Sequence, residues 1–319
     1  MFNMKQSDKI NLVYIASIGH SGSTLVESML GTHSKIATCG EIHIWPHEII
    51  RQGVLPCSCG KSVIDCEFWD KMLKSVNPLD QSEPQIDFFR EKHNAGHTVR
   101  LNRLLDFTSK KLDLETERKI RVYAQNNYSV FKSFLELIQV ELDTQVDWIV
   151  DASKDPYRLA WLARSDLFNL KVIQIVKNPP AFIYSMLKKL PKDKAHSPYH
   201  RFYETTRQSL KWSIENELIS QAALNHLKAE DYMLINYEKL ASQPSETFKQ
   251  VCKMLNCQFE EKTVNNFRAG NVHTIAGNPM RYQKGGIVLD EKWKKLLSAN
   301  HRRMAETLTL INRHTYGYR

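Results

Sequence analysis

The residues best suited to chemistry lie near the start of the chain, in a small polar loop at residues 18–25 that reads Ile-Gly-His-Ser-Gly-Ser-Thr-Leu. An apolar run precedes this loop, and apolar residues at helical spacing follow it over residues 25–30. A loop that joins a strand to a helix N-terminus directs backbone N–H groups to one point, where the helix dipole favours negative charge. We therefore predict that the loop binds a phosphate or a sulfate. The predicted contacts are Gly19, His20, Ser21, Gly22, Ser23, Thr24 and Leu25.

This loop differs from two well-known nucleotide-binding motifs. A Walker A loop has four residues between its glycines and ends in Gly-Lys-Ser/Thr, whereas Gly19 and Gly22 are separated by two residues and Ser23 stands in place of the lysine. The dinucleotide fingerprint needs three spaced glycines. Glycine and serine are also typical of turns without a ligand, so the loop alone does not identify the anion.

The elements that must position the loop alternate between strands and helices. Apolar runs predict strands at residues 12–17, 147–151, 170–176 and 231–236. Periodicity predicts helices at residues 24–30, 201–227, 244–256 and 260–268, with others after Pro156 and Pro180. Such alternation implies right-handed crossovers and a doubly wound parallel sheet.

Ligands bind such sheets outside the carboxyl ends of the strands. Four polar segments follow predicted strands directly, at residues 17–22, 151–154, 177–185 and 236–237. The rule therefore brings these segments to a single crevice. Residues 85–143 are mostly helical by periodicity, and we interpret residues 50–143 as an insertion that caps the sheet on the acceptor side.

The same segments resemble the PAPS-dependent sulfotransferases (PAPS is 3′-phosphoadenosine 5′-phosphosulfate), whose first loop reads Arg/Lys-Ser-Gly-Thr/Ser-Thr. The other matching segments are residues 37–43, 151–156, 173–185, 236–240 and 283–285. They occur in the same order as in the family, and they are most similar to the bacterial and tyrosylprotein-type branch. The resemblance implies an α/β, P-loop-like three-layer sandwich with a central parallel sheet, as one domain over residues 1–319. It also implies PAPS as co-substrate, PAP as product, and transfer of a sulfuryl group to a hydroxyl or an amine.

The resemblance assigns roles to several side chains. Glu41 matches the base of the tyrosylprotein branch, although His43, and less so His20, remain alternatives. Lys154 would stabilise negative charge on the leaving side. Lys177 and Ser185 would hold the 3′-phosphate, and Tyr237 would pack near the adenine. The segment that includes Arg281, Lys284 and Gly285 would fold over the nucleotide as a lid.

Some positions depart from the family pattern. His20 replaces an arginine or lysine, Lys177 replaces an arginine, and Pro180 and Gln283 replace two more. Another cation, Arg281 or Lys284, would then have to contact the 3′-phosphate. These departures keep open a non-catalytic PAP-binding module, and a nucleotide kinase or NTPase is the remaining alternative.

Composition limits the partners. The chain has 319 residues, 42% of them hydrophobic, with a net charge of +9, which suits a large core and an anionic ligand. The basic residues are scattered, and groups such as Lys188 and Lys189 resemble solvated helix faces, so we expect no nucleic acid. We expect a small-molecule or glycan acceptor instead. The sequence does not predict the oligomeric state.

The sequence also bears on location. Residues 1–9 are polar and lack the apolar region of a signal peptide. No window reaches the ~18 apolar residues that a membrane span needs. We therefore expect a cytoplasmic protein without a membrane partner.

Three of the six cysteines, Cys57, Cys59 and Cys66, form a local cluster. A zinc site would need a fourth ligand, which we expect only His43 or His47 to supply. A disulfide from Cys66 to either of the other two would instead close a loop. Buried thiols are the preferred interpretation because a cytosolic setting disfavours disulfides, so the prediction includes no metal.

Overall fold

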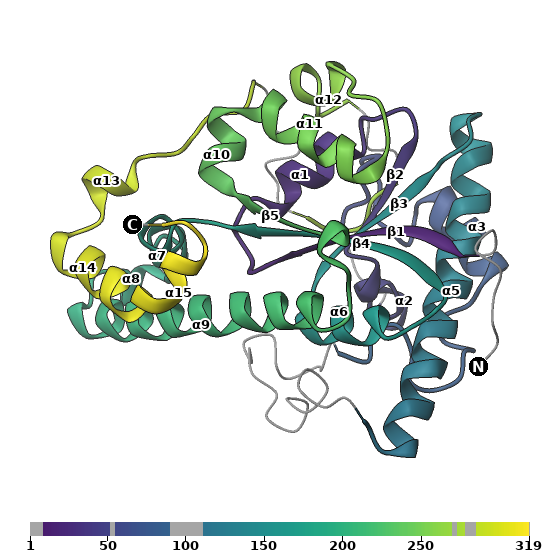
Figure 1. The fold of residues 1–319 in the computed structure, drawn as a ribbon, viewed down its shortest axis with the longest axis horizontal. Helices are drawn as coiled ribbons and strands as arrows, with labels where there is room; N and C mark the ends of the chain where they lie inside the picture. Colours follow the sequence, from purple (N-terminus) through teal and green to yellow (C-terminus); the bar gives the residue numbers. More distant parts are fainter. Residues whose placement is uncertain (1–8, 52–54, 90–110, 270–272, 278–284, 319) are drawn as a thin grey trace.

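A five-stranded parallel sheet forms the centre of the part of the chain that the computed structural model describes, with strand order β2-β3-β1-β4-β5 (Figure 1). The described residues are 9–51, 55–89, 111–269, 273–277 and 285–318. The strands are β1 (Ile10–Ser17), β2 (Ile36–Gly40), β3 (Trp148–Lys154), β4 (Phe168–Val176) and β5 (Tyr232–Asn236). This arrangement confirms the predicted α/β fold with a central parallel sheet.

Four of these strands coincide with predicted ones. Strands β1 and β4 are largely apolar and largely buried, as expected for strands covered on both faces of a parallel sheet, whereas β5 lies at the edge and is mostly half-buried. Strand β3 continues to Lys154, three residues beyond its predicted end at residue 151. Strand β2 was not predicted. It has five residues, Ile-Ala-Thr-Cys-Gly, and lies at the edge of the sheet, so neither length nor alternation marks it in the sequence.

Helices cover both faces of the sheet (Figure 1). On one face lie α1 (Ser23–Leu30), α10 (Tyr237–Ser242), α11 (Pro244–Leu255) and α12 (Lys262–Asn265), above the strands in the view. On the other lie α5 (Leu114–Leu142), α6 (Pro156–Ala163) and α9 (Pro198–Leu224). Alternate residues of β1 serve the two layers, since Val13 packs in the α1 and α11 core and Leu12 in the α5 and α6 core. The helix predicted at residues 260–268 is shorter, Lys262–Asn265.

The segment between β2 and β3 contains η2 (Ile42–Ile44), α2 (Trp45–Arg51), α3 (Glu67–Ser75) and α5. The carboxylate of Asp113 caps α5 by accepting a hydrogen bond from the N–H of Thr116 at 2.8 Å. Phe131 and Phe134 of α5 are fully buried against the sheet, so this helix is part of the core as well as of the predicted insertion. The single domain and the capping of an acceptor remain predictions.

Short helices near the C-terminus pack on the far end of α9, around α7 (Pro179–Leu187). They are α13 (Trp293–Leu296), α14 (Ala299–Leu308) and α15 (Leu310–Thr315), and α8 (Lys192–Ala195) also contacts α9. The short helix η4 (Ala229–Asp231) precedes β5 and contacts β4. A third core cluster forms there around Phe182, Trp212 and Tyr316. Among the described residues, no helix is both long enough and apolar enough to cross a bilayer.

A buried ion pair fixes the end of β3. The Nε and Nη2 atoms of Arg158 donate to Oδ2 of Asp151 at 2.9 and 2.8 Å, and both side chains have no exposed surface. Nη1 of Arg158 also donates to the Tyr123 hydroxyl of α5 at 2.7 Å. The pair therefore connects β3, α6 and α5, three residues before Lys154.

Replacing Arg158 by alanine leaves Asp151 as a buried charge without its partner. We expect Arg158→Ala to lower the free energy of unfolding by about 3–5 kcal/mol in urea titrations. The control is Arg118→Ala, which removes an exposed pair with Glu115 and is expected to leave the free energy of unfolding nearly unchanged, because solvent screens exposed ion pairs. Equal losses in the two variants would contradict the importance of the buried pair.

Candidate functional site

The sheet has a topological switch between β1 and β3. The helix after β1, α1, packs against β2 and β3, whereas the helix after β3, α6, lies on the opposite face and packs against β1 and β4. The connections after β1 and β3 therefore leave the sheet on opposite faces, and the carboxyl edge between such strands is where ligands of doubly wound sheets bind. Ala16 of β1 pairs with Lys154 of β3 at this edge, which brings the predicted anion loop and Lys154 together.

The backbone of the loop has the form of an anion-binding turn. His20 and Gly22 have positive φ angles of 70° and 101°, and alternation of this kind turns successive N–H groups toward one point. Gly22 is the N-cap of α1 and provides no side-chain cap, so no side chain of the cap residue shields this helix N-terminus from a ligand. The loop can therefore receive an anion through its main chain.

Two residues of the loop, Ser21 and Gly22, add to this conclusion. Ser21 is completely buried, and among the described residues no hydrogen-bond partner reaches its Oγ. A buried hydroxyl without a hydrogen-bond partner is unfavourable, and an oxygen atom of a ligand would supply that partner. A β-carbon on Gly22 would lie 2.4 Å from Cδ2 of Tyr237, so the loop needs glycine there both for φ and for the approach of that ring.

His20 lies among positive charges. Its Nε2 contacts Nζ of Lys189 on the exposed turn after α7. Burial, followed by the charges of Lys189 and Lys154, lowers the pKa of His20 from 6.5 to about 4. The imidazole is therefore neutral at neutral pH in the protein without a ligand. The sequence pattern indicates a solvated helix face at Lys189, and no local pattern could show its contact with a residue 169 positions earlier.

Glu41 and Lys154 form an ion pair, with Oε1 and Nζ 2.5 Å apart. Their side chains are 22% and 18% exposed, so both are open to a ligand while held by the protein. Left-handed backbone conformations help to position both residues. Lys154 has a φ angle of 69°, and Gly40, which precedes Glu41, has a φ angle of 76°. The N–H of Glu41 donates to the carbonyl of Ile275 at 3.0 Å, which fixes the residue from the other side.

His43, the alternative base, lies two residues after Glu41, in η2. It is buried, and its N–H donates to Oγ of Ser153 at 3.4 Å. Ser153 in turn donates through its N–H to Asp151 at 2.9 Å. These bonds attach η2 to the end of β3, and the side chain that meets Lys154 is Glu41.

Lys177, Ser185 and Tyr237 come together at the ends of β4 and β5. Nζ of Lys177 lies 3.3 Å from Oγ of Ser185 and 4.8 Å from the centre of the Tyr237 ring. Burial lowers the pKa of Lys177, which an anion at this position would reverse. Because the same ring contacts Gly22, Tyr237 separates the anion loop from Lys177.

Glu238 supports this part of the crevice, although sequence reasoning gave it no role. Its Oε1 accepts from the N–H of Asn178 at 3.0 Å, and its Oε2 accepts from the hydroxyl of Tyr318 at 2.6 Å. The indole of Trp212 donates to the carbonyl of Lys177 at 2.9 Å. Arg281 and Lys284 lie outside the described residues, and Gly285, with φ 106°, is exposed.

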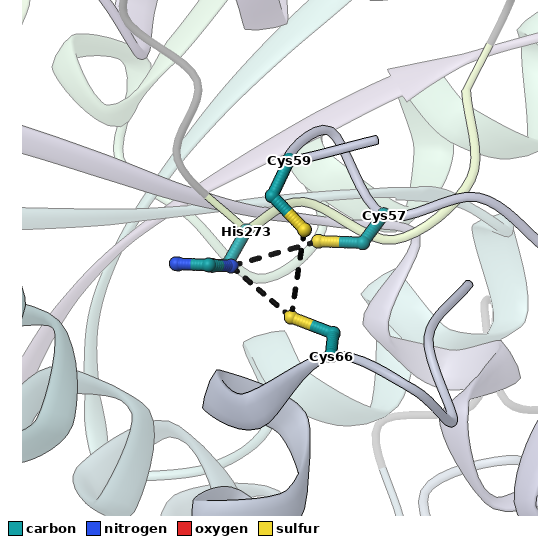
Figure 2. Close-up of side chains that lie close together, drawn as sticks. All are labelled: Cys57, Cys59, Cys66 and His273. Atoms are coloured by element: carbon teal, nitrogen blue, oxygen red, sulfur yellow. Dashed lines mark hydrogen bonds between the residues drawn. The ribbon is translucent and has the colours of Figure 1, made fainter. Parts of the chain in front are cut away.

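The cysteine cluster lies at the end of edge strand β2, and Figure 2 shows that a histidine from far along the chain joins it. One ligand atom from each of Cys57, Cys59, Cys66 and His273 lies within 4.8 Å of every other. Cys59 and Cys66 have Sγ atoms 3.7 Å apart and all three cysteines are thiols, so neither disulfide alternative is formed. The fourth member is His273, and the expectation that only His43 or His47 could take that place was wrong.

Comparisons with known proteins agree with this architecture. A sulfotransferase domain model matches residues 157–280. The solved sulfotransferase domain from the curacin biosynthetic pathway is similar with TM-score 0.51 and 21% identity, over 94% of this chain and 98% of that chain. The sulfotransferase domain from the Synechococcus PCC 7002 olefin synthase gives TM-score 0.49 and 19% identity, over 97% and 98%. No curated protein matches the chain.

The curacin-pathway domain shares the fold of this chain over nearly its whole length. The assignment to the bacterial and tyrosylprotein-type branch stays a prediction. The match to the sulfotransferase domain model covers residues 157–280, so this part of the chain is similar to that family.

Proposed function

We propose that this protein transfers the sulfuryl group of PAPS to a hydroxyl or an amine of an acceptor and releases PAP. The observation that carries the proposal is the Glu41–Lys154 pair, which lies beside an anion-binding turn at the carboxyl edge of the sheet. The family match makes sulfuryl transfer the expected chemistry for such a pair. We further propose a small-molecule or glycan acceptor and a cytoplasmic site of action.

The geometry supports one orientation of the nucleotide. The turn at residues 18–25 would hold the 5′-phosphosulfate through its N–H groups and Ser21. Lys177 and Ser185, on the other side of the Tyr237 ring, would hold the 3′-phosphate. An ammonium on a flexible stem binds phosphate as a point charge, without the bidentate geometry of the arginine that the family uses.

The reaction then needs a base and a charge stabiliser. As the acceptor oxygen or nitrogen bonds to sulfur, its proton passes to the carboxylate of Glu41, and the bond from sulfur to the bridging oxygen breaks. The electron pair of that bond stays on the 5′-phosphate of PAP. Lys154, with His20 as a nearby donor, would stabilise the charge that develops there. By analogy with phosphoryl transfer, positioning and electrostatics supply most of the catalysis.

Binding of the 3′-phosphate can be tested without turnover. Calorimetry is expected to show that PAP binds more tightly than AMP, which lacks that phosphate. Lys177→Ala should remove most of this preference, by about tenfold or more since a charged hydrogen bond contributes about 1.5–3 kcal/mol. The control is Lys253→Ala, at an exposed lysine of α11. An unchanged preference in Lys177→Ala would remove this residue from the 3′-phosphate site.

Glu41→Gln keeps the shape of the side chain but removes the base. We expect turnover with labelled PAPS and a panel of acceptors to fall by about 10²–10⁴-fold, while PAP affinity changes little. Glu246→Gln is a matched control, because Glu246 also pairs with a lysine, Lys249, at 2.9 Å but on an exposed face. Turnover by Glu41→Gln at the wild-type rate would refute the assignment of the base.

The charge state of His20 provides a test that is independent of turnover. Its pKa of about 4 lies below the ordinary value of 6.5, so between these values the unfolded chain binds more protons. The stability contributed by neutral His20 is therefore present above pH 6.5 and lost as the pH falls toward 4. Added PAP should raise this pKa in NMR titrations, because its phosphates offset the neighbouring lysines.

Variants at His20 complete the test. His20→Ala should lower turnover about tenfold or more, whereas His20→Arg should retain it. A pKa that does not move with PAP, together with normal turnover in His20→Ala, would exclude this residue from the mechanism.

A further inference from the structure

The four side chains of the cysteine cluster have the spacing of a tetrahedral metal site. Zinc binds thiolate sulfur at about 2.3 Å and imidazole nitrogen at about 2.0–2.1 Å, so the edges of its tetrahedron are about 3.5–3.8 Å. Sγ of Cys59 lies 3.7 Å from Sγ of Cys66, and Nδ1 of His273 lies 3.7 Å from Sγ of Cys57 and 3.2 Å from Sγ of Cys66. We propose that Cys57, Cys59, Cys66 and His273 bind one zinc ion.

The local backbone already presents the cysteines in the required way. Cys57 and Cys59 lie in a tight turn, in which the N–H of Gly60 donates to the carbonyl of Cys57 at 3.0 Å and Gly60 has φ 93°. Cys66 is the N-cap residue of α3. The positive end of a helix dipole stabilises a thiolate, which is the form of cysteine that binds metal.

The orientation of His273 supports the same conclusion. While Nδ1 points toward the sulfurs (Figure 2), Nε2 lies 3.6 Å from Oε1 of Glu141 on α5. A carboxylate behind the distal nitrogen is the usual partner of a metal-binding histidine. The imidazole also stacks on Phe68 of α3, with ring centres 4.7 Å apart and planes 2° from parallel.

The backbone of His273 is held in an unfavourable conformation. Its φ is 130°, a value that residues other than glycine seldom adopt. The hydroxyl of Ser58 accepts the N–H groups of His273 and Thr274 at 3.1 and 2.9 Å. Such strain persists where the surroundings over-determine the conformation, and a metal bond to the imidazole would be one such constraint.

The zinc site would have a structural role. Four protein ligands leave no open position for a substrate. The ion would join the turn at residues 57–60 to residues 273–277, whose Ile275 bridges both Cys57 and Gly40 and accepts the N–H of Glu41. It would thus fix the segment against which Glu41 is positioned. The proposal does not depend on PAPS, on the acceptor or on turnover.

The test is the metal content of the full-length chain, purified without a histidine tag or chelator from zinc-supplemented cells. Elemental analysis should find about one zinc per chain. Cys59→Ser and His273→Ala should each lose most of it. Cys257→Ser is the matched control, because Cys257 belongs to the other cluster of the described residues, with His33 and Cys252, which offers three ligands. Wild-type protein without zinc, or zinc lost from Cys257→Ser instead, would overturn the proposal.

Two further measurements distinguish loss of a zinc ligand from misfolding of the variant. Cys59 is exposed, so Cys59→Ser should keep the wild-type circular dichroism spectrum while it loses zinc. Cobalt exchanged into the wild-type protein should give the visible absorption of a tetrahedral thiolate site, absent in Cys59→Ser. Mass spectrometry under non-reducing conditions provides the opposing result. Metal-free protein that is lighter by two hydrogens, with a Cys59–Cys66 disulfide found by peptide mapping, would show a redox pair instead of a zinc site.

Discussion

The buried ion pair of Asp151 and Arg158 is the interaction on which the rest of the crevice depends. Two charges without solvent are stable only when every polar group around them is satisfied. Here Ser153 and Tyr123 contribute, and through Ser153 the network reaches the N–H of His43 in η2. The ends of β2 and β3 are thus fastened to each other from inside the core. Glu41 directly follows β2 and Lys154 is the last residue of β3, so this network also fixes the distance between these two residues.

A second constraint is electrostatic. Lys154, Lys177 and Lys189 surround His20 closely enough to lower its pKa, and burial lowers the pKa of Lys177 as well. A protein without an anion in this crevice keeps these positive charges at some cost, which Glu41 offsets only in part. Such an arrangement is typical of a site whose ligand carries several negative charges. Because the lysines lie at the end of β3, directly after β4 and in the turn after α7, the positive charge is concentrated in one place more than the overall charge of +9 indicates.

Much of the site could be predicted from the sequence because it follows strands. Residues 18–25, Lys154, Lys177 and Tyr237 each stand at the carboxyl end of an apolar run, and one topological rule places all of them at the same edge. Glu41 was found by resemblance, since its strand β2 was not recognised. Arg158 and Glu238 were missed because charged residues are ordinarily exposed, and only packing shows that they are enclosed.

The sequence by itself determined four of the five described strands, most of the helices between them, the small polar turn at residues 18–25 and the identity of the side chains at the predicted strand ends. It could do so because hydrophobic periodicity and turn chemistry act over a few neighbouring residues. Only the tertiary structure decided that Lys189 meets His20, that Tyr237 packs on Gly22, and that His273 joins cysteines more than two hundred positions earlier. Those contacts arise from how distant segments cross at the sheet edge, and no local pattern encodes such a crossing.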